Sequence, residues 1–253
     1  MANLRTLLAR VKRNILKKPF IKDPKLPAFW FDKKLNTQDA FIVQIGSNDG
    51  KTGDPLFPLL QKNKNWKALF VEPVPYSFKK LKANYPDTNR FAFENVAINQ
   101  GEPLTFYWVD HSAKTEIPNL PYWFDQLGSF NRQHILNHFD GALEPFIRSK
   151  KLEGLTLPTL FERNQIEKIN ILHIDTEGYD WKILSQLDLN KFQPDFILME
   201  YNHLSKEELQ QTTTFLKSKY TLFNLGIDML AVHNSASPEL LKGMKNKLTQ
   251  LES

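Results

Sequence analysis

The sequence predicts an α/β protein built on a doubly wound, mostly parallel sheet. From residue 41 onward, short apolar runs alternate with stretches of helical periodicity. An apolar run without polar alternation is typical of a strand that helices cover on both faces. The last two runs are joined by Gly226-Ile227, which predicts a hairpin and hence a reversed strand at the end of the sheet. We therefore expect a Rossmann-like sheet of seven strands that closes with an antiparallel hairpin.

Seven apolar runs supply these strands. In chain order they are FIVQI (41–45), ALFV (68–71), FENVAI (93–98), NILHID (170–175), DFILMEY (195–201), YTLFNLG (220–226) and DMLAVH (228–233). The stretches between the runs carry helical signals. Trp181, Leu184 and Leu187 share one helix face, and Ser205 forms a capping box with Glu208 three residues later.

Residues 1–30 differ from the rest of the chain in charge and periodicity. Apolar residues recur there at helical spacing, namely Leu4, Leu7, Leu8, Val11 and Ile15. A basic amphipathic helix of this kind either lies on an anionic membrane surface through residues 1–20 or packs against the domain or a partner chain. Prolines at positions 19, 24 and 27 then mark a linker. We expect the main domain to span residues 31–253.

The composition excludes several classes of protein. No apolar stretch approaches the ~18–20 residues of a membrane-spanning helix, and we find no signal-peptide pattern. The absence of cysteine excludes disulfides, thiolate metal ligands and a cysteine nucleophile, and it fits a cytoplasmic protein. Residues 1–26 carry eight of the 33 basic residues against one acid, so the body of the chain is near neutral. We therefore expect no nucleic-acid partner, while the oligomeric state is open.

The first strand-to-helix turn is the best candidate for a ligand loop. In open α/β sheets, ligands bind beyond the carboxyl ends of the strands, near the point where strand order reverses. The turn reads Gln44-Ile45-Gly46-Ser47-Asn48-Asp49-Gly50. Gly46 would let the backbone pass close to a ligand, and Gly50 would permit a tight turn into the next helix. Because the spacing is not G-x-G-x-x-G, it argues for an adenosine ligand smaller than a dinucleotide.

Two further strand ends fit the same ligand. Glu72 ends the second strand, 22 residues beyond Gly50, where a carboxylate can accept both hydroxyls of a ribose. Asn95-Val96-Ala97 follows the next strand, where an adenine ring could lie against small apolar groups. Three consecutive strand ends thus offer a glycine turn, an acid and a small apolar surface. Together they indicate an adenosine-binding site more specifically than any one of them alone.

These segments together resemble one family, the FkbM-type S-adenosylmethionine-dependent methyltransferases. The resemblance covers roughly residues 41–233 and rests on FIVQIGSNDG, LFVEPVPYSFKKLKANY, ENVAIN, LTLPTLFERNQIEKINILHIDTEGYDWKIL and PDFILMEY. It implies a class I methyltransferase fold and methyl transfer from S-adenosylmethionine, typically to a hydroxyl oxygen of a carbohydrate or small molecule. It also implies that Gly46 and Gly50 are cofactor glycines, that Glu72 is the ribose acid and that residues 95–97 meet the adenine.

Several loop positions complete the cofactor site that the resemblance implies. Ser47 and Asn48 lie between the two glycines, and Asp175 ends a strand beside the loop. Gln44 departs from the family pattern, which more often has an acid at this position. Its amide oxygen can still accept a hydrogen bond from the cofactor ammonium, but without charge assistance.

Acids at the ends of the fourth and fifth strands indicate the reaction centre. Asp175 is followed by Glu177, and Glu200 is followed by His203. If the two strands are neighbours, these groups converge beside the first loop. Either Asp175 or His203 is then a general base that Glu200 orients, or Asp175, Glu200 and His203 hold a divalent metal ion. Without a metal-specific spacing, the general base is the preferred interpretation.

Glu177 has a functional and a structural interpretation. It is a candidate for contact with the substrate. The alternative is that Asp175 and Thr176 cap a helix that starts near Gly178, with Glu177 favoured at its positive end. His173 lies inside an apolar strand and is predicted to be a core histidine with satisfied ring nitrogens.

An insertion at about residues 103–157 interrupts the alternation of strands and helices. A long insertion in a doubly wound domain is typical of a substrate cover. Ser129 and His134 are candidates for contacting the cofactor carboxylate or the substrate. His134 and His138 lie four residues apart, but HILNH lacks the glutamate of a zinc-protease helix, so we do not expect this pair to bind metal. Four aromatic residues either line a sugar-binding face or form the core of the insertion: Tyr122, Trp123, Phe124 and Phe130.

Two other functions are compatible with such a fold. An NAD-linked oxidoreductase fits poorly, because the glycine spacing differs and no Tyr-x-x-x-Lys relay follows the fourth strand. A non-catalytic binding protein would not need the acids Glu72, Asp175 and Glu200 together.

Overall fold

The computed structural model of the chain describes residues 20–121, 123–124 and 127–251. The basic helix predicted within residues 1–20, its membrane contact and the side chain of Tyr122 lie outside these ranges. In the part of the chain that the structure describes, no helix is both long and apolar enough to cross a bilayer.

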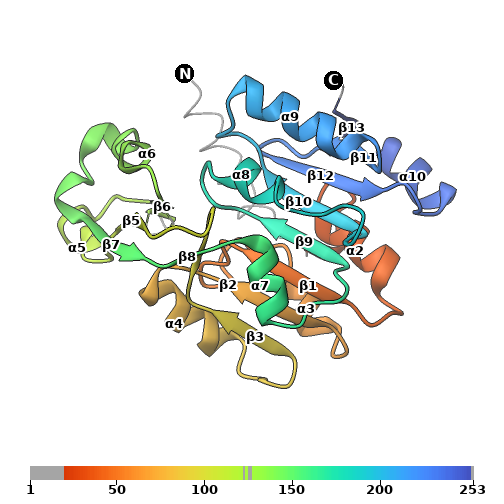
Figure 1. Cartoon of the computed structure of the whole chain (residues 1–253), viewed down its shortest axis with the longest axis horizontal. Helices are drawn as coiled ribbons and strands as arrows, with labels where there is room; N and C mark the ends of the chain where they lie inside the picture. Colours follow the sequence, from red (N-terminus) through yellow and green to blue (C-terminus); the bar gives the residue numbers. More distant parts are fainter. Residues whose placement is uncertain (1–19, 122, 125–126, 252–253) are drawn as a thin grey trace.

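The central sheet has the strand order β13-β11-β12-β10-β9-β1-β2-β3 (Figure 1). Its strands are β1 (Phe41–Ile45), β2 (Lys67–Val71), β3 (Phe91–Glu94), β9 (Ile171–Ile174), β10 (Phe196–Glu200), β11 (Tyr220–Asn224), β12 (Asp228–His233) and β13 (Thr249–Gln250). The strands from β3 to β10 pair in parallel, and β12 pairs antiparallel with both β10 and β11. This is the doubly wound α/β fold that the sequence predicts. The order reverses at β1, which lies between β2 and β9.

Two details of the sheet differ from the prediction. The sheet has eight strands and not seven, because the short strand β13 adds to β11 at the edge. The apolar run 93–98 is two strands, since β3 ends at Glu94 and β4 (Ala97–Ile98) pairs with β8 (Gly154–Leu155) outside the main sheet. The polar Asn95 separates the two strands and bonds to the backbone after β2.

Helices cover both faces of the sheet. Adjacent strand residues face opposite ways, so Ile42 packs in one core and Val43 in the other. The first core is shared with α2 (Pro27–Leu35), α3 (Phe57–Lys62), α4 (Pro75–Asn84) and α10 (Pro238–Lys245). The second is shared with α7 (Leu157–Arg163), α8 (Asp180–Leu184) and α9 (Lys206–Lys217). The predicted capping box opens α9, with Ser205 and Glu208 each accepting the other's backbone N–H.

The main domain begins earlier than the predicted boundary between residues 30 and 31. A short 3-10 helix spans Phe20–Lys22, and α2 then begins at Pro27. Trp30 is buried in the first core, and its indole N–H donates to the carbonyl oxygen of Pro24 at 2.8 Å. Pro27 therefore starts a helix, as its fixed φ favours, and does not extend a linker.

The insertion forms a small unit of its own at one side of the sheet (Figure 1). Its antiparallel sheet consists of β6 (Gly128–Ser129), β5 (Leu104–Val109) and β7 (Ile147–Leu152), in that order. It also contains α5 (Ala113–Glu116), α6 (Arg132–Leu136) and two 3-10 turns, Phe139–Gly141 and Glu144–Phe146. A separate apolar cluster stabilises it, which includes Trp123, Phe124 and Ile135.

Candidate functional site

A pocket lies at the carboxyl ends of β1, β2 and β9, where strand order reverses. Of the predicted site residues, those that line it are Gln44, Gly46, Ser47, Asn48, Glu72, Val96, Ala97, Asp175 and Glu177. The insertion adds Phe106, Gly128 and Phe130 to the wall. The pocket is therefore built jointly by the sheet and the insertion.

Gly46 brings the loop after β1 against the loop after β9. Its φ is +78°, and a β-carbon at this position would overlap the carbonyl oxygen of Asp175. Both the left-handed backbone and the close approach require glycine. The sequence interpretation assigned this closeness to a ligand, but the nearest group is the backbone of the neighbouring strand's loop. Gly46 also lines the pocket, so this one glycine both forms part of the pocket wall and allows the close contact between the two loops.

Glu72 is a buried carboxylate in a fixed orientation. Its Oε2 accepts the N–H of Asn48 and its Oε1 accepts the N–H of Val74, both at 2.7 Å. Burial raises the pKa of Glu72 to about 7, even though these two hydrogen bonds lower it. Each oxygen keeps a further lone pair, so the carboxylate can accept hydrogen bonds from the hydroxyl groups of a ligand in the pocket.

Gln44 is paired with an acid that sequence reasoning missed. Its Nε2 donates to Oδ2 of Asp54 at 2.7 Å, and both residues line the pocket. Oδ1 of Asp54 accepts the N–H groups of Leu56 and Phe57 at 2.6 and 3.2 Å. Burial raises the pKa of Asp54, while the charge of His173 opposes the rise. Oε1 of Gln44 is buried and makes no hydrogen bond to any described residue. The pair thus presents a carboxylate and an unused amide oxygen.

His173 is not the satisfied core histidine that the sequence predicts. It lies on β9 beside Gln44 and is 8% exposed. Its Nδ1 is buried and has no hydrogen-bond partner among the described residues, and the residue lines the pocket. The apolar strand around it hides a polar group that faces the site.

Six predicted site residues are not among the described residues that line the pocket, and three of these, Gly50, Asn95 and Ser129, make contacts beside it. Gly50 has a φ of +65° and packs against Tyr85, whose hydroxyl donates to the Gly50 carbonyl at 2.6 Å. Asn95 donates its Nδ2 to the Glu72 carbonyl at 2.7 Å. Ser129 is buried, and its hydroxyl accepts the N–H of Asn131 at 3.1 Å. These contacts hold backbone in place beside the site.

The loop after β9 is held by Asp180, and the capping alternative does not apply. Helix α8 begins at Asp180, so Asp175 and Thr176 do not form its cap. The Asp180 carboxylate instead accepts the N–H groups of Thr176 and Gly178 at 3.1 and 3.0 Å. Burial, reinforced by the charge of Asp175, raises the pKa of Asp180 to about 7. Between the two held N–H groups, Glu177 adopts a φ of +53°.

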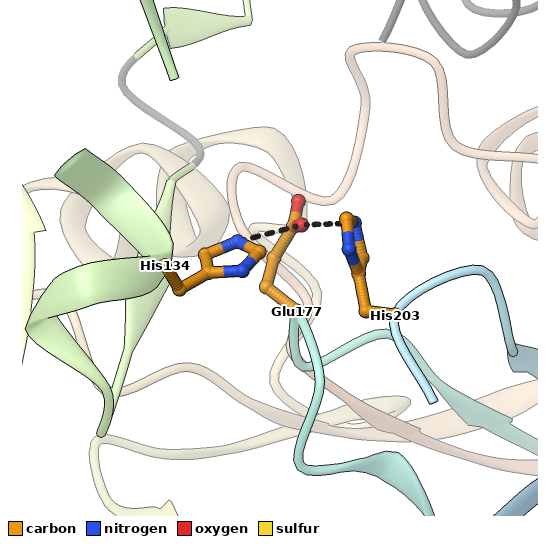
Figure 2. A group of neighbouring side chains, drawn as sticks. All are labelled: His134, Glu177 and His203. Atoms are coloured by element: carbon orange, nitrogen blue, oxygen red, sulfur yellow. Dashed lines mark ion pairs between the residues drawn. The ribbon is translucent and has the colours of Figure 1, made fainter. Parts of the chain in front are cut away.

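Glu177 places its carboxylate between two imidazole rings from distant parts of the chain (Figure 2). Its Oε2 lies 3.3 Å from Nε2 of His134, on α6, and 3.2 Å from Nε2 of His203, after β10. Nε2 of His203 is also 3.8 Å from Oε1 of Glu200. One carboxylate oxygen from each of Asp175, Glu177 and Glu200 lies within 4.8 Å of the others. The parallel pairing of β9 and β10 therefore brings the predicted acids together, and the insertion adds His134.

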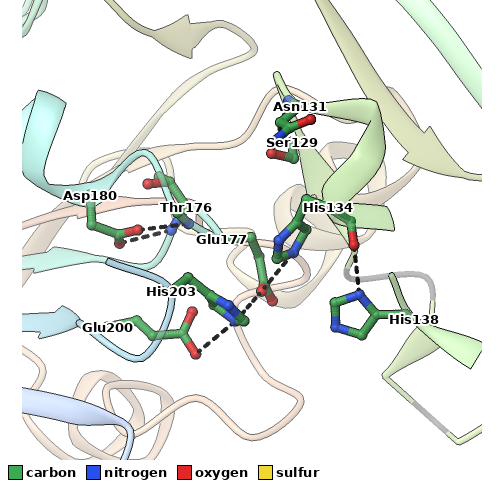
Figure 3. Close-up of polar contacts among 10 residues, drawn as sticks. Ser129, Asn131, His134, His138, Thr176, Glu177, Asp180, Glu200 and His203 are labelled. Atoms are coloured by element: carbon green, nitrogen blue, oxygen red, sulfur yellow. Dashed lines mark hydrogen bonds and ion pairs between the residues drawn. The ribbon is translucent and has the colours of Figure 1, made fainter. Parts of the chain in front are cut away.

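His138 supports this group from within the insertion (Figure 3). Its Nδ1 lies 2.8 Å from the carbonyl oxygen of His134. Because a carbonyl only accepts, Nδ1 carries the proton. Burial lowers the pKa of His138, which favours the neutral ring. His138 thus fixes the backbone that carries His134.

Comparison with known proteins identifies the family. The model of the methyltransferase FkbM domain matches residues 44–229, more than half of the chain. The chain belongs to the FkbM methyltransferase domain family. Among solved structures it is similar to the O-methyltransferase from Bacillus cereus in complex with SAH. The identity is 10%, the match covers 91% of this chain and 90% of that one, and the TM-score is 0.42.

Two other proteins are similar to this FkbM-domain chain. Aeropyrum pernix fibrillarin with natively bound S-adenosyl-L-methionine is 10% identical over 90% of this chain and 73% of that one, with a TM-score of 0.40. A curated glutamine synthetase of Butyrivibrio fibrisolvens is 26% identical over 126 residues, which cover 43% of this chain and 18% of that protein. The chain therefore spans less than a fifth of the length of that curated relative.

The aromatic residues of the insertion in this FkbM-domain protein have divided roles. Trp123 and Phe124 are buried in the insertion's own core, as the structural alternative expected. Phe130 instead lines the pocket, where its ring centroid lies 5.0 Å from that of Tyr179. The sequence does contain a signal for Asp54, which the predictions did not name. Asp54 directly precedes Pro55, close to the start of a helix. His134 was itself a predicted candidate, but no sequence signal paired it with Glu177, which lies 43 residues away in the chain.

Proposed function

We propose that this FkbM-domain protein transfers a methyl group from S-adenosylmethionine to a hydroxyl oxygen of a carbohydrate or small molecule. Family membership supports methyl transfer. The observation that carries the choice of cofactor is the presence of two separate buried carboxylates, Glu72 and Asp54, in one pocket. An adenosine ligand with an amino-acid tail offers hydroxyl donors for one of them and an ammonium for the other.

The hydrogen-bond acceptors of the pocket fit S-adenosylmethionine. Glu72 would accept the ribose hydroxyls, because two backbone N–H groups already fix its orientation. Asp54 and the unused oxygen of Gln44 would accept the ammonium group. Asp54 thereby supplies the charge that Gln44 lacks. Val96 and Ala97 line the pocket and would lie against the adenine.

The acceptor half of the pocket would bind and deprotonate the hydroxyl. When bound, S-adenosylmethionine supplies an electrophilic methyl group on a sulfonium. Of the three predicted catalytic residues, Asp175 is the one that lines the pocket, so we assign it to accept the hydroxyl proton. Glu200 and His203 are not among the described residues of the wall. They would act on Asp175 and Glu177 through charge and position. Phe130 and Tyr179 offer aromatic faces on which a sugar ring can stack.

Ligand-induced stabilisation tests the cofactor assignment. We would compare S-adenosylmethionine, S-adenosylhomocysteine and NAD by thermal shift with the wild type, Glu72→Ala and the exposed control Glu153→Ala. A ligand at 100 times its Kd stabilises the folded state by about 2.7 kcal/mol. We expect both adenosyl ligands to stabilise the wild type and the control, and neither to stabilise Glu72→Ala. Stabilisation by NAD alone, or by none of the three ligands, would contradict the proposal.

Methyl transfer itself is tested with methyl-labelled S-adenosylmethionine. Label should appear in carbohydrate or lipid extracts incubated with the enzyme, with and without EDTA, and not with Asp175→Ala. A methyl ether on oxygen resists mild alkali, whereas a methyl ester does not. Label that alkali releases, or that sits on nitrogen or carbon, would keep the methyltransferase and exclude the hydroxyl acceptor.

A further inference from the structure

We infer that His134, Glu177 and His203 form a binding site for a divalent first-row transition metal ion. The three residues come from the insertion, the loop after β9 and the segment after β10. One ligand atom from each lies within 4.8 Å of the other two. This site goes beyond the proposed methyl transfer, since its test reads metal binding directly.

The distances suit ligands that share one ion. The Nε2 atoms of His134 and His203 lie 3.3 and 3.2 Å from the same carboxylate oxygen of Glu177. Ligand atoms about 2.1 Å from a metal are separated by roughly 3.0 Å in octahedral and 3.4 Å in tetrahedral geometry. Figure 2 shows both rings turned toward the Glu177 carboxylate from opposite sides.

His134 points a buried ring nitrogen at this group. Its Nε2 is buried and makes no hydrogen bond within the part of the chain that the structure describes, although Glu177 is close. The carboxylate oxygen of Glu177 lies 3.3 Å from this nitrogen. A cation bound by both atoms would give the buried nitrogen a strong partner.

The surroundings supply what a metal site needs beyond its ligands. Glu200 and Asp175 each place a carboxylate oxygen within 4.8 Å of one from Glu177, so an ion would neutralise mutually repelling acids. The N–H at Nδ1 of His138 donates to the backbone carbonyl of His134 and so restrains the backbone that carries this metal ligand. The held N–H groups on either side of Glu177 fix the loop that carries the third ligand.

The ligand types predict the class of ion. Two imidazole nitrogens with one or more carboxylates suit zinc, iron, cobalt or manganese, whereas magnesium and calcium prefer oxygen ligands alone. Three protein ligands also leave positions for water or another oxygen. Since one ligand belongs to the insertion and two belong to the sheet edge, the ion would clamp the insertion onto the pocket.

Metal titration of the full chain tests the site. We would remove metal with a chelator and titrate zinc, cobalt, manganese and magnesium by calorimetry. The variants are His134→Ala, His203→Ala, Glu177→Gln and the control His233→Ala, which removes an imidazole on β12. We expect one ion per chain, with zinc or cobalt preferred over magnesium. Removing any of the three ligands should weaken binding at least about 100-fold, and His233→Ala should leave it unchanged.

A spectrum of the cobalt-loaded wild type keeps the test decisive if a variant fails to fold. Visible absorption and X-ray absorption should report two imidazole ligands and at least one carboxylate. No stoichiometric ion, equal binding by His134→Ala and wild type, or a cobalt site without imidazole would overturn the inference. Binding of S-adenosylhomocysteine is measured on the same samples, so failure of the metal site is distinguishable from failure of the proposed function.

Discussion

The chain builds its pocket and the neighbouring group of His134, Glu177 and His203 in different ways. In the proposed cofactor half of the pocket, Gln44, Asp54 and Glu72 come from β1, from the loop after it and from the position directly after β2. The group beside the proposed acceptor half brings together His134, Glu177 and His203 from three separate segments. A site made of consecutive strand ends is complete as soon as the sheet forms. A site that needs the insertion depends in addition on how a separate small unit docks.

Gly46→Ala should have the largest effect, because it breaks both halves at once. The new β-carbon would overlap the carbonyl oxygen of Asp175, and the residue would be held at a φ of +78°. We expect a loss on the order of 3 kcal/mol or more in the free energy of unfolding, measured by urea denaturation. Gly53→Ala is the matched control, since Gly53 has a φ of +75° but no atom near the added carbon. It should lose only about 1–2 kcal/mol. Equal losses would show that strain, and not the contact between the loops, explains Gly46.

Asp175→Ala and Glu72→Ala should separate the halves. Asp175→Ala removes the proton acceptor and should lower turnover about 10²–10⁴-fold, while S-adenosylhomocysteine still binds. Glu72→Ala should abolish measurable binding of S-adenosylhomocysteine. Calorimetry and a methyl-transfer assay on both variants read the two effects. Equal loss of binding in both variants would show that the division of roles is mistaken.

Asp54→Asn should sharpen the account of the cofactor half. Asparagine can keep Oδ1 as acceptor for the N–H groups of Leu56 and Phe57 while it removes the charge, and its Nδ2 then donates to Gln44 Oε1 once the Gln44 amide flips. We expect affinity for S-adenosylhomocysteine to fall about tenfold, the size of one charge-assisted hydrogen bond. Affinity for 5′-methylthioadenosine, which lacks the amino-acid tail, should not change. A parallel fall for both ligands would place Asp54 elsewhere than at the ammonium group.

The smallest expected effect is a pH dependence of cofactor affinity. The pKa of Glu72 is raised to about 7, and hydroxyl donors favour its ionised form. Binding should therefore release a proton below that pKa, and affinity for S-adenosylhomocysteine should rise between about pH 6 and about pH 8. Calorimetry in two buffers of different ionisation enthalpy measures the released proton. Glu72→Gln should remove the release, and affinity that falls as pH rises would contradict the assignment.

The sequence predicted the fold and the strand-end residues of the pocket more fully than the contacts that the insertion makes. Apolar runs and glycine turns are local signals, so β1, β10 and the loop around Gly46 were found close to their final bounds. The acids Asp175 and Glu200 were predicted to meet because parallel neighbours end at the same edge. His134 could not be matched to Glu177, since no local pattern encodes how the insertion docks. His173 was misjudged because an apolar strand does not reveal which way its one polar side chain points.

The insertion leaves and rejoins the domain through β4 and β8, two strands that lie side by side. Its two ends are therefore only about 4.8 Å apart, the spacing of paired strands. A change in the length of the stretch between them need not move the sheet, so the stretch could be exchanged as a cassette. Ala97 and Ile98 of this stem also line the pocket, so a transplanted cassette would bring its own cover to an unaltered cofactor wall. Acceptor preference in such chimeras should follow the cassette and not the host.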